Sequence, residues 1–493
     1  MRTSGILMHI SSLPSPGGIG TLGDEAFAFA DFLRASGLSI WQVLPIGPTG
    51  YGESPYQSSS VFAGNPLLIS LPKLRGEGLL DFRDEELYRP AAEDRVDYDE
   101  VRKNKTELLQ RCFRQSGEKL QSQVDAFRME NPWVDDFGLF TAVKAKFSQQ
   151  MWTKWPDRDI KFRKPEAIAR YREELKEEIR FHVFCQYLFR KQWFALKAYC
   201  NDHGISLFGD MPIYVAEDSA DTWTHPEIFQ LDRDRIPKRV AGVPPDYFSE
   251  DGQLWGNPLY RWMYLRFRGY DWWVDRMKGM AALYDMIRID HFIGFANYYS
   301  VPYGAPNARN GKWVIGPGKA LFKKLQAEIP NIRIIAEDLG CVNARVRRLL
   351  DWCGYPGMKV LTFGFDSDET NPHFIGNYRE NSVAYTGTHD NDTALGWAQK
   401  ADPKVLAFAG KTCGFTTAEE APAALIRALF ACPCKIAIVP MQDLLGLDGS
   451  ARMNYPGAAG GNWLWRMKDG ALTADLSMRI FRLNKETNRS DHE

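Results

Sequence analysis

Three features of the sequence predict an α/β fold, a (β/α)8 TIM barrel with large, mainly helical insertions between strands. Short apolar runs recur along the chain, and each of them ends in small or polar residues. Amphipathic segments separate several of these runs, as the helices of a parallel barrel do. Two separations are far longer than one strand-to-helix connection needs, so we expect inserted structure there.

Eight apolar runs have the composition of strands that are buried on both faces of a parallel sheet. They are GILMHIS (5–11), IWQVLPI (40–46), SLFGDMPIYV (206–215), MIRIDHF (286–292), RIIAEDL (333–339), MKVLTFGF (358–365), SVAYTGTHD (382–390) and KIAIVPMQD (435–443). The segments 24–36 and 319–329, before the second and fifth runs, have the periodicity of amphipathic helices. The alternation predicts that residues 1–493 form a single enlarged catalytic barrel.

The two long separations are residues 47–205 and 216–285. We expect the first to hold a mainly helical subdomain over residues 72–200. Near its end, apolar side chains repeat every four residues, which is typical of helical core packing and implies no chemistry. These side chains are Tyr171, Leu175, Ile179 and Val183.

The second separation contains the stretch AGVPPDYFSEDGQLWGNPLY (241–260). Pro, Gly and Asp interrupt regular structure here, so we expect a loop that displays Tyr247, Phe248 and Trp255. Aromatic side chains in loops favour a binding surface.

The bulk composition argues against several classes of partner. Lys and Arg total 61 against 62 Asp and Glu, and a net charge of -1 provides no field that would attract nucleic acid or an anionic membrane. No window approaches the roughly 18 apolar residues of a spanning helix, and the N-terminal ILMHI is too short for a signal peptide. We therefore expect a cytoplasmic protein whose partner is small or uncharged.

The sequence carries no pattern typical of a metal or an organic cofactor. The eight cysteines contain no C-x-x-C pair, which favours free thiols over a zinc site. DSDET (366–370) lacks the downstream Gly and Glu of a calcium loop, and neither G-x-G-x-x-G nor a Walker loop is present. We expect a protein that works without cofactor or metal.

Charged residues stand at the end of the fourth apolar run, within YDMIRIDHFIGFANYY (284–299). The period of two along a strand places Arg288 and Asp290 on one face and His291 on the other. A buried structural ion pair would explain an isolated R-x-D. The function of this pair therefore has to be inferred from the other polar residues of the barrel.

Carboxylates stand at the predicted ends of four strands. They are Asp210 in FGDMP, Asp290 in RIDHF, Glu337 in IAEDL and Asp390 in THDN. Any one of them could cap a turn or a helix. Because the active site of such a barrel lies at the carboxyl ends of its strands, their shared position predicts a catalytic site.

Clustered carboxylates suit either a metal site or glycoside chemistry, and Arg288 helps to choose between the two. A neighbouring cation favours the ionised form of Asp290, as a nucleophile requires, and would repel a divalent metal. Among its carboxylate neighbours the pKa of Glu337 should rise, as a general acid requires.

A series of motifs resembles the amylomaltases, the 4-α-glucanotransferases or disproportionating enzymes of the α-amylase clan, from end to end of the chain. In order, they are SSLPSPGGIGTLG, WQVLPIGPTGYGESPYQSSSVFAGNP, GDMPIYVAEDSADTW, AGVPPDYFSEDGQLWGNPLY, RIDHFIGF, IIAEDLG, TGTHDND and ARMNYPG with GNW. The resemblance implies a retaining double displacement that transfers segments of α-1,4-glucan to the 4-hydroxyl of an acceptor glucose or maltooligosaccharide.

The same resemblance implies a role for each strand-end acid. Asp290 would be the nucleophile, Glu337 the general acid and then base, and Asp390 the residue that holds the sugar in its transition state. The side chains that would contact the glucose unit at the cleavage site are Arg288, His291, His389 and Asp210. The 241–260 loop would lie over the glucan chain with Tyr247, Phe248, Gln253 and Trp255.

Five further residues fit sugar contacts less specifically. Tyr51, Ser54 and Tyr56 follow the second strand, where ordinary turn packing would also explain them. Asn454 and Asn462 are equally suited to fixing the backbone of their loop.

Two other functions are consistent with the same residues. A hydrolase of the same clan would use the same carboxylates and differ in whether water or a sugar hydroxyl resolves the intermediate. The aromatic loop favours transfer, because a covered site with a bound acceptor excludes water. A non-catalytic carbohydrate-binding protein could reuse the fold, but the acids Asp290, Glu337 and Asp390 argue against it.

Overall fold

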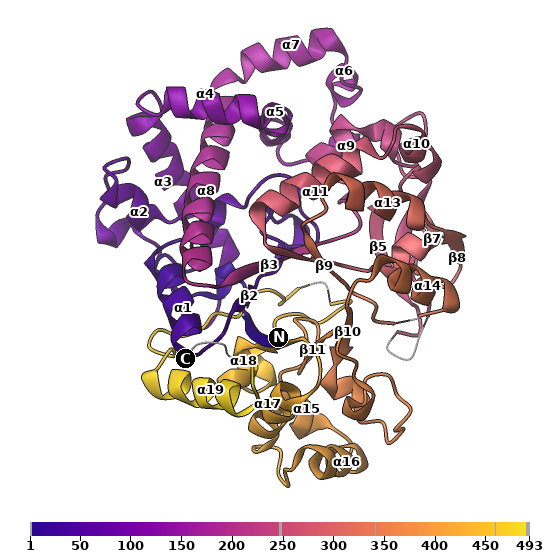
Figure 1. Ribbon diagram of the computed structural model, residues 1–493. Coiled ribbons are helices and arrows are strands. Elements are labelled where there is room, and N and C mark those ends of the chain that lie inside the picture. Colours follow the sequence, from indigo (N-terminus) through magenta and orange to yellow (C-terminus); the bar gives the residue numbers. More distant parts are fainter. Residues whose placement is uncertain (1, 246–248, 341, 459, 490–493) are drawn as a thin grey trace.

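Eight parallel strands form a closed barrel at the centre of the molecule in the computed structural model, which describes residues 2–245, 249–340, 342–458 and 460–489 (Figure 1). Around the barrel they follow the order of the chain: β1 (Thr3–Leu7), β2 (Ile40–Gln42), β3 (Ser206–Met211), β6 (Met286–Ile289), β9 (Arg333–Ala336), β10 (Gly357–Val360), β11 (Ser382–Tyr385) and β12 (Ile436–Pro440). This confirms the predicted (β/α)8 barrel, and each predicted run contributes one strand.

The strands end earlier than the apolar runs, and the remainder of each run enters the loops at the carboxyl end of the barrel. β6 ends at Ile289 and β9 at Ala336, so Asp290 and Glu337 are the first residues after their strands. In the ladder between β3 and β6, Asp210 pairs with Arg288. Residues paired across neighbouring strands point to the same face, so these two side chains meet.

Helices surround the barrel (Figure 1). Those outside the two long separations are α1 (Asp24–Ala35), α12 (Ile293–Ala296), α13 (Lys319–Glu328), α14 (Ala344–Cys353), α15 (Ala394–Lys400), α16 (Pro403–Cys413), α17 (Ala421–Ala431), α18 (Met441–Leu444) and α19 (Ala474–Glu486). Both predicted helices, 24–36 and 319–329, are present as α1 and α13. The C-terminal α19 contacts α1, so the last helix packs against the first.

The chain between β2 and β3 is largely helical. Its helices are α2 (Leu71–Gly76), α3 (Tyr98–Ser116), α4 (Gln121–Glu130), α5 (Trp133–Lys146), α6 (Arg158–Lys161), α7 (Pro165–Glu174) and α8 (Lys176–Asp202). The four-residue stripe from Tyr171 to Val183 is buried, but two helices share it. Leu175, with φ -108 and ψ 26, separates α7 from α8.

The stretch 241–260 was expected to be a loop, and this was wrong at both of its ends. β4 (Arg239–Val243) and β5 (Gln253–Pro258) leave a shorter connection between them, whose Tyr247 and Phe248 lie outside the described residues. With β7 (Asn297–Pro302) and β8 (Lys312–Ile315) they form an antiparallel sheet in the order β5-β4-β7-β8. Pairing with the distant β7 stabilises strands that the Pro and Gly residues alone would disfavour.

Three further helices lie between β3 and β6. They are α9 (Ala220–Thr224), α10 (Trp262–Phe267) and α11 (Asp271–Leu283). Among the described residues, no helix is both long enough and apolar enough to cross a membrane.

Candidate active site

A cavity of about 550 Å³ opens beside the carboxyl ends of the barrel strands. It is lined by twelve of the sixteen residues predicted for the site: Ser54, Tyr56, Gln253, Trp255, Arg288, Asp290, His291, Glu337, His389, Asp390, Asn454 and Asn462. β6 and β9 deliver Asp290 and Glu337 directly, and the segment after β11 delivers Asp390. A cavity of this size with convergent polar groups is typical of a small-molecule site.

Arg288 connects two of the carboxylates. Its Nη1 lies 2.8 and 2.7 Å from the two oxygens of Asp210 and 2.9 Å from Oδ1 of Asp290. Burial alone would lower the pKa of Arg288, but the two carboxylates hold it well above its ordinary value. The guanidinium therefore stays charged and orients Asp290 at the cavity.

Asp210 is fully buried beneath this cavity and is not among the residues that line it. Besides the bonds from Arg288, its Oδ2 accepts a 2.7 Å hydrogen bond from the Tyr56 hydroxyl. Gly209 precedes it because a Cβ there would lie 2.2 Å from the ring of Tyr284. Asp210 thus holds Arg288 and Tyr56, which themselves face the cavity.

Glu337 is buried and accepts hydrogen bonds at both oxygens. The backbone N–H groups of His291 and Leu339 donate to Oε2 and Oε1, each at 2.7 Å. Burial raises the pKa of Glu337 to about 8, and the charge of Asp290 adds to this rise, while Arg288 and the two backbone bonds oppose it. The predicted rise in pKa is present, but desolvation is its main cause.

His291 presents an uncharged imidazole to the cavity. Burial lowers its pKa to about 4, and its Nε2 has no hydrogen-bond partner among the described residues. The ring packs against Trp255 at 4.8 Å between centroids and an interplanar angle of 87°. The sequence pattern placed His291 on the strand face opposite Arg288 and Asp290. In the structure β6 ends at Ile289, so His291 lies outside the strand, with a φ of 49°. A left-handed non-glycine residue stores strain of a kind found at functional sites.

Asp390 is held by a loop that lies 62 to 64 residues later in the sequence. Asn454 Nδ2 donates to Asp390 Oδ1 at 2.6 Å, and Arg452 Nη2 donates to the Asp390 carbonyl oxygen at 2.6 Å. His389 Nε2 lies 3.4 Å from the same Oδ1. The Asp390 side chain remains 45% exposed, so one face of the carboxylate can meet a ligand.

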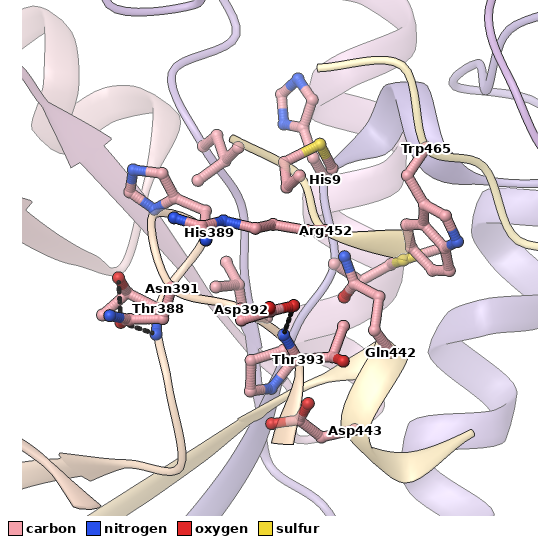
Figure 2. A pocket seen from close by; sticks show the side chains of 15 residues that line it. His9, Thr388, His389, Asn391, Asp392, Thr393, Gln442, Asp443, Arg452 and Trp465 are labelled. Carbon is pink, nitrogen blue, oxygen red and sulfur yellow. Dashed lines mark hydrogen bonds between the residues drawn. The ribbon is translucent and has the colours of Figure 1, made fainter. Parts of the chain in front are cut away.

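Behind His389 lies a second cavity of only about 20 Å³ (Figure 2). Thr388 donates to Asn391 Oδ1 through both its N–H and its hydroxyl, the bonds drawn in Figure 2. At the lower edge of this view is Asp443, which is buried. Its carboxylate accepts from the Thr386 hydroxyl at 2.6 Å and from the Ala394 N–H at 2.7 Å. One side chain therefore joins both ends of the segment 386–394, which carries His389 and Asp390.

The sequence profile of the 4-alpha-glucanotransferase family matches residues 8–473. The chain belongs to the 4-alpha-glucanotransferase family. It is 44% identical to the 4-alpha-glucanotransferase of Clostridium butyricum over 482 residues, which cover 97% of this chain and 99% of the relative. It is also 44% identical to the 4-alpha-glucanotransferase of Thermus thermophilus over 500 residues, covering 99% of each chain.

A solved structure has the same fold over its full length. The amylomaltase from Streptococcus agalactiae in complex with acarbose superimposes with a TM-score of 0.97 at 40% identity, covering 100% of both chains. These comparisons confirm the resemblance to the amylomaltases and identify this protein as a glucanotransferase.

The remaining predicted residues of this glucanotransferase have smaller structural roles. Ser54 Oγ accepts from the Tyr56 N–H at 3.3 Å, and Gln253 Oε1 accepts from Trp255 Nε1 at 3.1 Å. Asn462 bonds the backbone of its own loop, through Oδ1 to the Tyr455 N–H at 2.9 Å. Tyr51 begins a short 3-10 helix (Tyr51–Glu53), and its side chain lies outside the described part of the structure.

Sequence reasoning missed several residues at the site. Gln57 donates to Asn257 Oδ1 and to the Trp255 carbonyl oxygen, which fixes the strand β5 beside the cavity. Aromatic side chains that line the cavity without having been predicted are Tyr214, Trp313, Phe363, Tyr455 and Trp463. Trp463 stands in the GNW motif, which could have pointed to it, whereas Trp313 belongs to a strand that no local pattern predicted.

Proposed function

We propose that this enzyme transfers segments of α-1,4-glucan to the 4-hydroxyl of an acceptor glucose or maltooligosaccharide by a retaining double displacement. One observation carries the mechanism. A single cavity contains Asp290, bound to the charged Arg288, and Glu337, whose pKa of about 8 keeps it protonated at neutral pH. A nucleophilic carboxylate and a protonated acid are the two groups that a retaining glycosidic reaction requires.

In the first step, a carboxylate oxygen of Asp290 attacks the anomeric carbon and the bond to the leaving-group oxygen breaks. Glu337 donates its proton to that oxygen, so the leaving chain departs with a free 4-hydroxyl and a glucosyl ester remains on Asp290. Esterification removes the negative charge of Asp290, which had helped to raise the pKa of Glu337. The ionised Glu337 is then better suited to act as a base.

In the second step, Glu337 accepts the proton of the acceptor 4-hydroxyl while the oxygen of that hydroxyl attacks the anomeric carbon. The ester bond to Asp290 breaks, and two inversions at one carbon give net retention. The uncharged His291 lines the cavity, and we expect its imidazole to contact the glucose unit. Asp390, fixed by Asn454 and Arg452, can bond the hydroxyls of the glucose unit as its ring flattens.

Membership of a transferase family favours this function over hydrolysis and over binding without catalysis. The amylomaltase from Streptococcus agalactiae binds acarbose, and we expect this cavity to bind it as well. We also propose a cytoplasmic location, in keeping with the free cysteines of the described residues.

Incubation of the purified enzyme with maltotriose, with the products separated by size, tests the proposal. We expect glucose together with a series of longer maltooligosaccharides, no net gain of reducing ends, and the same rate in the presence of EDTA. A net gain of reducing ends equal to the bonds broken would instead identify a hydrolase. Unchanged maltotriose would leave only a binding protein.

A further inference from the structure

Trp313 is an exposed aromatic side chain that lines the active-site cavity. It lies in β8, the last strand of the sheet β5-β4-β7-β8, at the right of Figure 1. The side chain is 44% exposed, although large aromatic residues usually bury most of their surface. The indole is therefore available for contact with a ligand in the cavity.

The Trp313 ring is supported by a rigid neighbour. Its partner in the ladder is Tyr299 on β7, and the two rings meet at 5.3 Å between centroids with an interplanar angle of 66°. Tyr299 is buried, and its hydroxyl donates to the Ala308 carbonyl oxygen at 3.1 Å. Gly311 allows this packing, because a Cβ there would lie 2.1 Å from the Tyr299 ring. The indole is thus held in place before any ligand arrives.

Trp313 and Trp255 lie at opposite edges of one sheet. Trp255, which contacts His291, lies on β5 at the opposite edge of the same sheet. Three strand spacings separate β5 from β8, which corresponds to roughly 14 Å. A ligand that contacts both Trp255, which lies against His291, and Trp313 must therefore be longer than a single glucose unit.

We propose that Trp313 is the stacking platform of a distal glucan subsite and makes the enzyme favour long maltooligosaccharides over short ones. The apolar face of a glucose ring matches the flat, partly desolvated surface of the indole. A chain too short to reach β8 gains nothing from this contact. The inference rests on the proposed glucan transfer and adds a determinant of chain length to it.

Ile315 provides a matched control on the same strand. It lies two residues beyond Trp313, is 62% exposed, and is not among the residues that line the cavity. We expect Trp313→Ala to lower kcat/KM for maltoheptaose about tenfold, equivalent to about 1.4 kcal/mol of lost stacking. With maltotriose, Trp313→Ala should match the wild type, and Ile315→Ala should match it with both substrates. Trp313→Phe should recover most of the activity on maltoheptaose.

The inference fails if Trp313→Ala changes kcat/KM equally for both chain lengths, or for neither, while its melting temperature equals that of Ile315→Ala. Calorimetric binding separates this failure from failure of the proposed function. In an Asp290→Asn background, Trp313→Ala should weaken the binding of maltoheptaose and leave that of maltotriose unchanged. A wild-type enzyme that transfers no glucan would refute the proposed function, and this binding comparison would still test Trp313. If Asp290→Asn binds maltoheptaose with the same affinity with and without Trp313→Ala, the proposed subsite is refuted.

Discussion

Glu337 and Asp290 share one cavity but lie in different immediate surroundings. Glu337 is buried under the backbone N–H groups of His291 and Leu339, whereas the Asp290 side chain is 26% exposed and touches the guanidinium of Arg288. Burial raises the pKa of Glu337 to about 8. Desolvation thus suits Glu337 to the proposed role of acid, and one cation suits Asp290 to the proposed role of nucleophile.

The pH dependence of turnover should report Glu337. Because the proposed mechanism requires a protonated Glu337 in its first step, we expect kcat/KM to fall as pH rises through about 8. Glu337→Gln should reduce kcat by about 100- to 10,000-fold, the usual contribution of a general acid. Unchanged melting with activity near that of the wild type would refute the assignment.

Arg288 should set the pH at which kcat/KM falls, which is the basic limb of the pH profile. Its charge opposes the rise in the pKa of Glu337, so its removal should move the limb to higher pH. Replacing Arg288 alone would leave the buried Asp210 without its partner, which is strongly destabilising. The comparison is therefore Asp210→Asn with Arg288→Met against Asp210→Asn alone, by pH profiles of kcat/KM. An unmoved limb would mean that Arg288 does not act on Glu337.

At the scale of the element, a single buried acid joins the two ends of the segment 386–394. Asp443 on α18 bonds Thr386 at the start of the segment and the Ala394 N–H at its end. Burial raises the pKa of Asp443 to about 6. Below that pH the proton must lie on the oxygen that faces the Thr386 hydroxyl, which can accept it, because the backbone N–H of Ala394 cannot, and both bonds lose the strength that the charge gave them.

Asp443→Ala should therefore lower kcat more than it raises KM, because the proposed role of Asp390 is to hold the sugar in its transition state. Thr386→Val, which removes one of the two bonds, should have a smaller effect of the same kind. Steady-state kinetics on maltotriose measure both. If Asp443→Ala raises KM and leaves kcat unchanged, the segment serves ground-state binding only.

Element by element, the sequence predicted what is locally encoded. The barrel strands were found because strands buried on both faces are continuous apolar runs, and the four acids were found because each stands at the predicted end of a strand. β4 and β5 were missed because β5 pairs with β4, and β4 in turn pairs with β7, which lies more than 50 residues beyond it in sequence. The break at Leu175 was missed because the apolar period continues through it.

In the candidate site, too, locally encoded features could be predicted and long-range contacts could not. Asp290 and Glu337 could be placed from their strands, whereas the contacts of Arg452, Asn454 and Asp443 join loops far apart in sequence. No spacing rule predicts which loop side chain will meet which backbone group. The main cause of the high pKa of Glu337 was likewise hidden, because burial is a property of the assembled barrel.

For the molecule as a whole, the buried acids make stability depend on pH. A carboxyl group whose folded pKa lies above its unfolded value favours folding only while it is protonated. That contribution is complete below the unfolded pKa, which is about 4.5 for Glu337, and it is lost as pH rises toward the folded value of about 8. The contribution of Glu337 to stability should therefore fall between pH 4.5 and pH 8, since its ionisation opposes folding there.

Removing this acid should stabilise the protein while abolishing its function. Glu337→Gln keeps the shape of the side chain and cannot ionise, so its melting temperature should exceed that of the wild type at pH 8. At pH 4.5 and below, where Glu337 is protonated in the folded state, the difference should become small. Thermal unfolding of both proteins across this range measures the effect, and Glu328→Gln provides a control because Glu328 is an exposed acid whose pKa is lowered by Lys324 and Lys278. Its melting difference should run in the opposite direction with pH. A Glu337→Gln protein that is less stable than the wild type at pH 8 would mean that the two backbone hydrogen bonds outweigh desolvation, and that Glu337 is not held protonated by the barrel.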